Sequence, residues 1–166
     1  MLIFHLTKKL QSKLGNPALS QEHVEASPHL RWYANFFTAD RTQYVLTTNA
    51  ASLFSVVMYK RGLTHDGLYI TRFLSTLREH MEHEGLELIY QRCIMPYTGS
   101  VMLAKTEDRS ALGSMNDMVN MSKFHLGDPD VSPYELTGQL NRTPFSAIDF
   151  SYPLEAFAQL PVEGTG

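Results

Sequence analysis

The hydrophobic and polar positions in the first third of the chain follow strand-like patterns. Residues 1–7 form an apolar run, and residues 8–15 then take the spacing of a short helix that Gly15 ends. Residues 16–29 contain two prolines among mixed polar residues, so we expect a loop. Three further apolar or alternating runs lie at 31–39, 42–49 and 53–60. Their short connections predict an antiparallel meander.

Two later segments have the 3.6-residue period of helices. In residues 64–84 one face collects Ile70, Phe73, Leu74, Leu77 and Met81. Thr64 or Asp66 is the expected N-cap of this helix, and Gly85 is expected to end it. A second helix is predicted to begin near Asp108.

The segments between and after these helices are shorter. Residues 86–95 and 100–106 are predicted to be strands, joined in a hairpin by the turn sequence PYTG. A short helix with Pro133 in its first turn is expected near residues 132–140.

This order of elements predicts an α+β fold. We expect a mainly antiparallel sheet of about five to six strands, with two main helices packed on one face. A repeating βαβ order is missing, which disfavours a Rossmann-type fold. The 166 residues suit one domain over 1–160, followed by a flexible C-terminal end at 161–166.

Composition narrows the class of protein. The formal net charge of −3 argues against nucleic acid as a partner, because counterion release needs clustered Lys and Arg. Cys93, the single cysteine, cannot form an internal disulfide and is expected to be a small buried hydrophobe. No apolar run is suited to a signal peptide or a membrane span, so we expect a cytoplasmic protein.

Histidines at i and i+3, His80 and His83, lie among acidic residues on the polar side of the first long helix. The HExxH spacing of a zinc protease is missing, so a solvated charged face is the interpretation that we prefer. We expect no metal site and no cofactor.

The second long helix combines an apolar face with a polar stripe. Its apolar face gathers five residues: Ala111, Leu112, Met115, Met118 and Val119. On the other side Arg109, Gly113, Asn116 and Asn120 stand at i, i+4, i+7 and i+11, with Asp117 beside them. A glycine inside a helix costs roughly 1 kcal/mol relative to alanine, so close approach by a backbone, a side chain or a ligand is expected to offset that cost.

Three interpretations of this stripe remain open. It can be a network that holds the fold together, a binding surface, or a catalytic site. Arg109 offers a fork of donors suited to carboxylate or phosphate, and the asparagines offer donors and acceptors. The candidate binding residues are Arg109, Ser114, Asn116, Asp117 and Asn120, with Asn35 and Asn49 from the strands.

The first functional hypothesis is a non-enzymatic binding or regulatory module. Its ligand would be a protein segment or a small anion, and a homodimer is a candidate assembly because edge strands need protection. The alternative is a small hydrolase or nuclease-like enzyme, with Arg109 binding an anion and Asp117 or a histidine as base. A concave pocket that joins Arg109 to a histidine or carboxylate would favour the enzyme, and a flat stripe would favour the module. The sequence does not assign catalytic residues.

Several segments together resemble an uncharacterised bacterial family, a domain of unknown function. They are Thr7–Leu10, Trp32–Asn35, Thr48–Ser52, Lys105–Thr106 and the run from Arg109 to Asp117, RSALGSMND. The resemblance covers most of residues 1–125 and leaves out the segment after Asp128. It implies no activity, so it supports the fold and leaves the function open.

Overall fold

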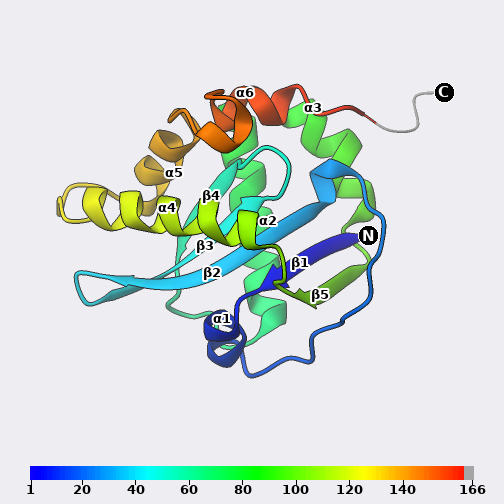
Figure 1. The fold of residues 1–166 in the computed structure, drawn as a ribbon, viewed down its shortest axis with the longest axis horizontal. Coiled ribbons are helices and arrows are strands. Elements are labelled where there is room, and N and C mark those ends of the chain that lie inside the picture. Colours follow the sequence, from blue (N-terminus) through cyan, green and yellow to red (C-terminus); the bar gives the residue numbers. More distant parts are fainter. Residues whose placement is uncertain (163–166) are drawn as a thin grey trace.

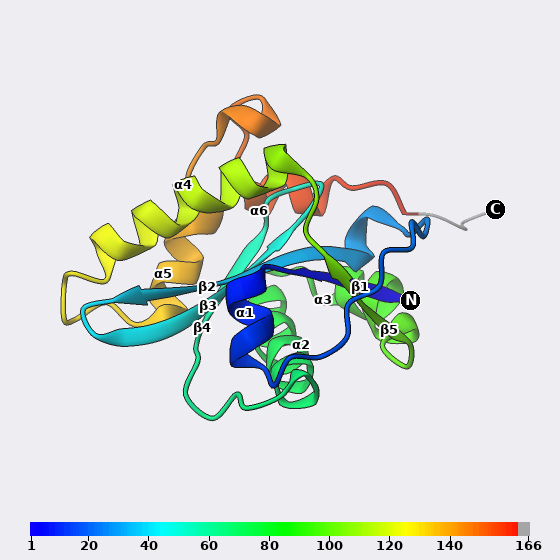
Figure 2. The same cartoon turned by 60° about the horizontal axis from the view of Figure 1, so that its bottom comes forward.

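The computed structural model describes residues 1–162 and shows a five-stranded sheet with helices on both faces (Figures 1 and 2). The strands are β1 (Leu2–Leu6), β2 (Arg31–Ala39), β3 (Thr42–Asn49), β4 (Ser55–Tyr59) and β5 (Val101–Lys105). They lie in the order β4-β3-β2-β1-β5. The helices are α1 (Lys8–Lys13), α2 (Asp66–His83), α3 (Glu87–Ile89), α4 (Arg109–His125), α5 (Pro133–Asn141) and α6 (Pro153–Ala158).

The predicted α+β class is confirmed, and so are most of the predicted elements. The meander β2-β3-β4 is antiparallel, as its short turns indicated. The apolar faces predicted for α2 and α4 are buried or partly buried, whereas Arg109, Asn116 and Asn120 are exposed. The aromatic strand β2 is covered on both faces, with Trp32 fully buried and Phe37 nearly so.

The prediction of a mainly antiparallel sheet was imprecise, because the sheet is mixed and β1 pairs in parallel with both β2 and β5. The cause lies in residues 86–95, which form α3 and irregular helical turns instead of a strand. Their buried residues Tyr90, Cys93 and Ile94 follow a helical spacing. Because this segment does not form a hairpin with β5, β5 pairs with β1 instead, and the two strands are parallel.

The prediction of two main helices on one face was also too narrow. Alternate residues of the strands point to opposite faces, and each face has its own core. Phe4 and Trp32 belong to the core under α2, where Phe73 packs edge-on to both rings. Leu46 belongs to the opposite core, which contains residues of α4 and α5. The helices therefore cover both faces of the sheet.

Two details of α2 differ from the sequence prediction. Its N-cap is His65, whose Nδ1 accepts from the backbone of Leu68, rather than Thr64 or Asp66. His80 does not lie on a solvated face, because only 4% of it is exposed and its ring stacks on Tyr134 of α5. The sequence placed His80 on the polar side of α2, but α5 covers that side.

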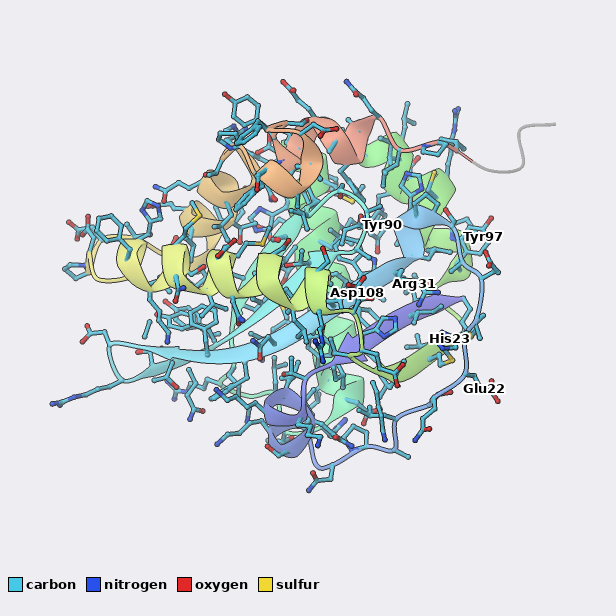
Figure 3. All side chains as sticks on the ribbon, viewed as in Figure 1. Glu22, His23, Arg31, Tyr90, Tyr97 and Asp108 are labelled. Carbon is cyan, nitrogen blue, oxygen red and sulfur yellow. The ribbon has the colours of Figure 1, made fainter. Side chains whose placement is uncertain are left out.

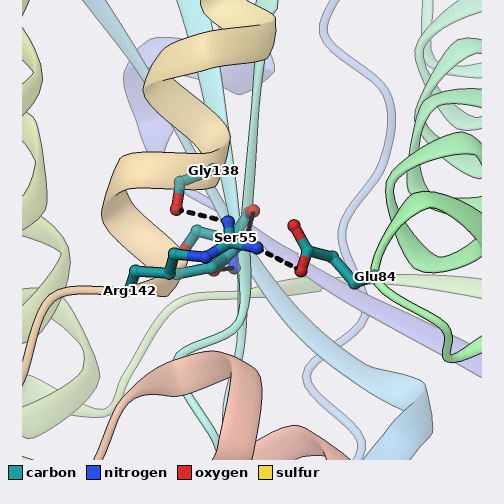
Figure 4. A network of polar contacts seen from close by, with 5 residues as sticks. Ser55, Glu84, Gly138 and Arg142 are labelled. Carbon is teal, nitrogen blue, oxygen red and sulfur yellow. Dashed lines mark hydrogen bonds and ion pairs between the residues drawn. The ribbon is translucent and has the colours of Figure 1, made fainter.

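Side chains cover the outer edge of β4. Asn141 of α5 accepts from the Ser55 backbone N–H and donates to the Ser55 carbonyl, at 2.8 and 2.9 Å. Thr137, one turn earlier, accepts from Val57 N–H at 3.0 Å. Figure 4 shows Arg142, the residue after α5, between Gly138 and Glu84 near Ser55. This edge therefore needs no partner chain to satisfy its backbone at Ser55 and Val57.

None of the helices within residues 1–162 combines the length and apolarity needed to cross a membrane. The expectation of a flexible end at 161–166 concerns mainly residues 163–166, which lie outside the described part of the chain.

Candidate functional site

A cleft of about 450 Å³ lies over the C-terminal halves of β1 and β5 and the start of β2. One wall is the connection over residues 20–26, and the other is the segment from Lys105 to Asp108, which leads into α4. Figure 3 shows Asp108 at the start of α4, Glu22 and His23 on the long connection, and Arg31 between them. We call this cavity the β1–β5 cleft.

The outer wall of the cleft is fixed to the sheet. Ser20 pairs with the edge of β5 through two backbone bonds, to Leu103 at 2.8 Å and from Lys105 at 3.3 Å. Further along, the carbonyl of Val24 accepts a hydrogen bond from Nη2 of Arg31. The wall is thus held at both ends, and the cleft exists without a ligand to shape it.

His5 and Tyr33 form the aromatic floor of the cleft. They are register partners on β1 and β2, and their rings stack with centroids 4.5 Å apart and planes 14° apart. Nδ1 of His5 lies 2.7 Å from the Lys105 carbonyl, so this nitrogen carries the hydrogen and donates. Nε2 is then free to accept from Nη1 of Arg31, also at 2.7 Å.

These contacts and the burial of the two rings set the protonation states of His5 and Tyr33. Burial lowers the pKa of His5, and the Arg31 charge adds to this effect against the backbone bond to Lys105. The imidazole is therefore neutral near pH 7, with both nitrogens engaged. Burial raises the pKa of the Tyr33 phenol, and the charge of Asp108 raises it further. Neither ring is poised as a base.

Arg31 is a half-buried cation without a carboxylate partner in the described chain. Its hydrogen bonds go to the neutral imidazole of His5 and to the carbonyl of Val24. The ion pairs within residues 1–162 are Arg78–Glu82 and Arg142–Glu84. Arginine in such a position usually meets a carboxylate or a phosphate.

Carboxylates also line this cleft, but none of them lies within ion-pair distance of Arg31. Glu107 and Asp108 come from the segment before α4, and Glu22 and Glu25 come from the connection. Asp108 also caps α4, since its Oδ1 accepts from the backbone of Ser110 and Ala111 at 2.9 and 3.2 Å. Glu107 is exposed and makes no side-chain hydrogen bond within the described chain. The cleft therefore combines the Arg31 cation with carboxylates on both of its walls.

The residues predicted from the sequence lie mostly elsewhere. Arg109, Asn116, Asp117 and Asn120 share the exposed side of α4, which continues from the rim of the cleft. Their side chains make no hydrogen bond or ion pair with residues 1–162, and a Cβ on Gly113 would meet no atom within 4 Å. Nothing in the described chain approaches the glycine, so the fold itself does not explain it. Ser114 is half-buried and lies to one side of this stripe.

The two asparagines from the strands have structural contacts. Asn35 accepts from Thr7 Oγ1 at 2.8 Å, which ties the N-cap of α1 to β2. Asn49 is fully buried, donates to the Pro28 carbonyl at 2.8 Å and accepts from the backbone of Ser52 at 3.0 Å. Neither lies on the α4 stripe, and Asn49 is inaccessible to a ligand.

A family model described as Domain of unknown function (DUF6933) matches residues 3–156. The chain belongs to this family. The match continues beyond Asp128, where the sequence resemblance stopped, so α5 and most of α6 are part of the family domain. Among curated proteins, none matches the chain.

Sequence reasoning missed the floor and walls of the β1–β5 cleft. His5, the β2 residues Arg31 and Tyr33, and Glu107 come from three distant parts of the sequence, and no spacing rule links those parts. The parallel pairing of β1 with β2 and β5 brings them together. The available signal was the polar His5 within an otherwise apolar strand, since a buried polar group must find partners.

Proposed function

We propose that this protein is a non-enzymatic binding module, and that the β1–β5 cleft holds a small zwitterionic ligand of the α-amino acid type. The observation that carries the proposal is Arg31, a half-buried guanidinium without a carboxylate partner among residues 1–162, in a cleft that carboxylates also line. A ligand carboxylate would give Arg31 its counter-ion. The ligand ammonium would then meet Glu107, because Asp108 already caps α4.

The size of the cleft suits such a ligand. A cavity of about 450 Å³ belongs to the lower range of small-molecule sites. The stacked rings of His5 and Tyr33 close the floor of the cleft. The fixed outer wall reduces the ordering cost of binding, because the site is already formed.

The geometry gives less support to the hydrolase alternative. Arg109 does not line the β1–β5 cleft, and His5 in that cleft has a lowered pKa and two occupied nitrogens. A general base must be able to accept a proton from its substrate. His5 could do so only after losing the hydrogen bond from Arg31.

The test is calorimetric titration with α-amino acids, each compared with its N-acetyl and its amide derivative. We expect Glu107→Gln to weaken binding of the free amino acid about tenfold, and to leave binding of the N-acetyl derivative unchanged, because that derivative lacks the ammonium group. Arg31→Gln should weaken binding of the free amino acid. It should leave binding of the amide derivative unchanged, because that derivative lacks the carboxylate. Glu87→Gln, the same change on exposed α3, is the control.

Two results would refute the cleft proposal. One is the absence of binding by any amino acid at millimolar concentration. The other is equal affinity in Glu107→Gln and Glu87→Gln, which would mean that the cleft carboxylate does not contact the ligand.

The stripe on α4 is our second candidate, as a contact surface for a protein segment or a small anion. It is favoured by the exposure of Arg109, Asn116 and Asn120 and by the open space over Gly113. For the whole protein we propose a cytoplasmic location, supported by its one cysteine, a buried free thiol. A homodimer stays a proposal, with the uncovered start of β5 as the edge available for it.

A further inference from the structure

Four cations line a second cavity, of about 660 Å³, at the end of the sheet where β2 turns into β3. They are Arg41 in that turn, Lys60 and Arg61 after β4, and Arg72 of α2. No carboxylate lines the cavity, and none of the four cations forms an ion pair with residues 1–162. We call it the basic cradle. In a chain of net charge −3 it concentrates four of the 14 Lys and Arg residues at one point.

The position of Arg72 in the cradle is fixed. Its Nη1 donates to the carbonyls of Tyr59 at 3.1 Å and Arg61 at 2.7 Å. The guanidinium passes so close to Gly62 that a Cβ there would lie 2.7 Å from Nη2. Gly62 also has a φ of +85°, so glycine serves both the turn and the arginine.

Arg41 occupies a backbone position that would suit glycine better. Asp40 and Arg41 form the two-residue turn between paired residues Ala39 and Thr42, with φ of +47° and +67°. The second position of such turns strongly prefers glycine, because L-residues are strained at positive φ. An arginine in this position therefore costs stability, which directs attention to what its side chain does.

An apolar slot of about 370 Å³ adjoins the cradle and shares Tyr59 and Arg72 with it. Its other walls include Val57, Met58, Thr76 and Pro133, with Tyr134 and His80 at the α2–α5 side. Tyr59 is half exposed, and its ring already stacks on Tyr44 with centroids 5.4 Å apart. A flat ring can therefore extend an existing stack.

We propose that the cradle and the slot together bind a nucleoside phosphate. The phosphates would lie among the arginines, which favour phosphate oxygens through charge and fork-shaped donors. The base would lie in the slot against Tyr59. Nε2 of His80 is buried without a hydrogen-bond partner among the described residues, and a heterocycle brings the polar atoms that an aliphatic chain lacks. This favours a nucleoside over a fatty acid.

The experiment is titration of the full chain with ADP, pyrophosphate, adenosine and decanoate. We expect ADP to bind at least about tenfold more tightly than each of the other three, because only ADP fills both cavities. Affinity should also fall as salt rises. Pyrophosphate or decanoate binding as tightly as ADP would overturn the proposal, and so would the absence of ADP binding at millimolar concentration.

Arg41→Gly separates binding from folding. Glycine relieves the positive φ, so the midpoint of thermal unfolding should stay the same or rise, while ADP affinity falls about tenfold. Arg61→Gln should weaken ADP in the same way. Arg78→Gln, an equal loss of charge on the exposed side of α2, is the control and should bind as the wild type does. Wild-type affinity for ADP in both Arg41→Gly and Arg61→Gln would refute binding at the cradle. A changed affinity for ADP in Glu107→Gln would show that ADP occupies the β1–β5 cleft instead.

Discussion

At the scale of single residues, burial strongly lowers the pKa of His80. Burial lowers its pKa from 6.5 to about 4, against a weaker opposing effect of Glu84. The unfolded chain takes up a proton below pH 6.5, whereas the folded chain resists it until about pH 4. Folding stability contributed by neutral His80 is therefore complete above pH 6.5 and is lost as the pH falls through this window.

Replacing His80 with phenylalanine should remove this loss. The phenylalanine ring can keep the stacking contact that His80 makes with Tyr134, but it cannot be protonated. We expect the stability of His80→Phe relative to wild type to increase by about 2 kcal/mol between pH 7 and pH 5, as 1.5 pH units at roughly 1.4 kcal/mol each imply. Urea unfolding at both pH values measures it. Equal losses in the two proteins would mean that His80 is solvated in the folded state.

Arg109 and Asn116 give a second residue-scale prediction. Both are exposed, and their side chains make no hydrogen bond or ion pair within residues 1–162. Arg109→Ala and Asn116→Ala should therefore change the free energy of unfolding by no more than about 0.5 kcal/mol. Losses of about 1–3 kcal/mol would show that the stripe on α4 is a structural network, which the sequence also allowed.

At the scale of elements, α5 acts as a cover for the edge of β4. The amide of Asn141 forms two hydrogen bonds with Ser55, as a neighbouring strand would. Both residues are buried, so an alanine at 141 leaves a backbone donor and an acceptor unpaired. We expect Asn141→Ala to cost about 2–4 kcal/mol in urea unfolding. Gln139→Ala, on the exposed side of the same helix, should cost less than about 0.5 kcal/mol, and similar losses in the two variants would contradict the edge-covering role.

The individual elements also show which parts of the fold could be predicted from the sequence. The strands at 31–39 and 42–49 are predicted to the residue, because their patterns and turns are local. The parallel position of β5 is not predictable in this way, since it depends on residues 86–95 adopting helical turns. The exposed stripe on α4 followed from helical spacing alone. The β1–β5 cleft could not, because four separate segments build it and only the sheet order brings His5, Arg31 and Glu107 together.

At the scale of the whole molecule, the two proposed sites lie toward opposite ends of the sheet. The turn between β2 and β3 is at one end of Figures 1 and 2, and β5 is at the other. The two cavities share no lining residue. Ligands of the two sites should therefore bind independently unless a shared element moves, and a change that abolishes one site leaves the other intact for comparison.

The C-terminal segment decides whether the sheet is a stable unit. Residues after Gly127 contribute Leu136, Leu140, Phe145 and Phe157 to the two cores. At roughly 1.5–3 kcal/mol for each buried side chain, their removal costs about 6–12 kcal/mol, which is as large as the whole stability of a typical domain. The removal also uncovers the edge of β4 at Ser55 and Val57. A chain ending at Gly127 should thus lose its cooperative thermal transition in circular dichroism and form larger assemblies than the full chain in size-exclusion chromatography, whereas a chain ending at Val162 should behave as the full chain does in both measurements. A monomeric, cooperatively folding 1–127 chain would show that the domain ends before α5, against the family match to residue 156.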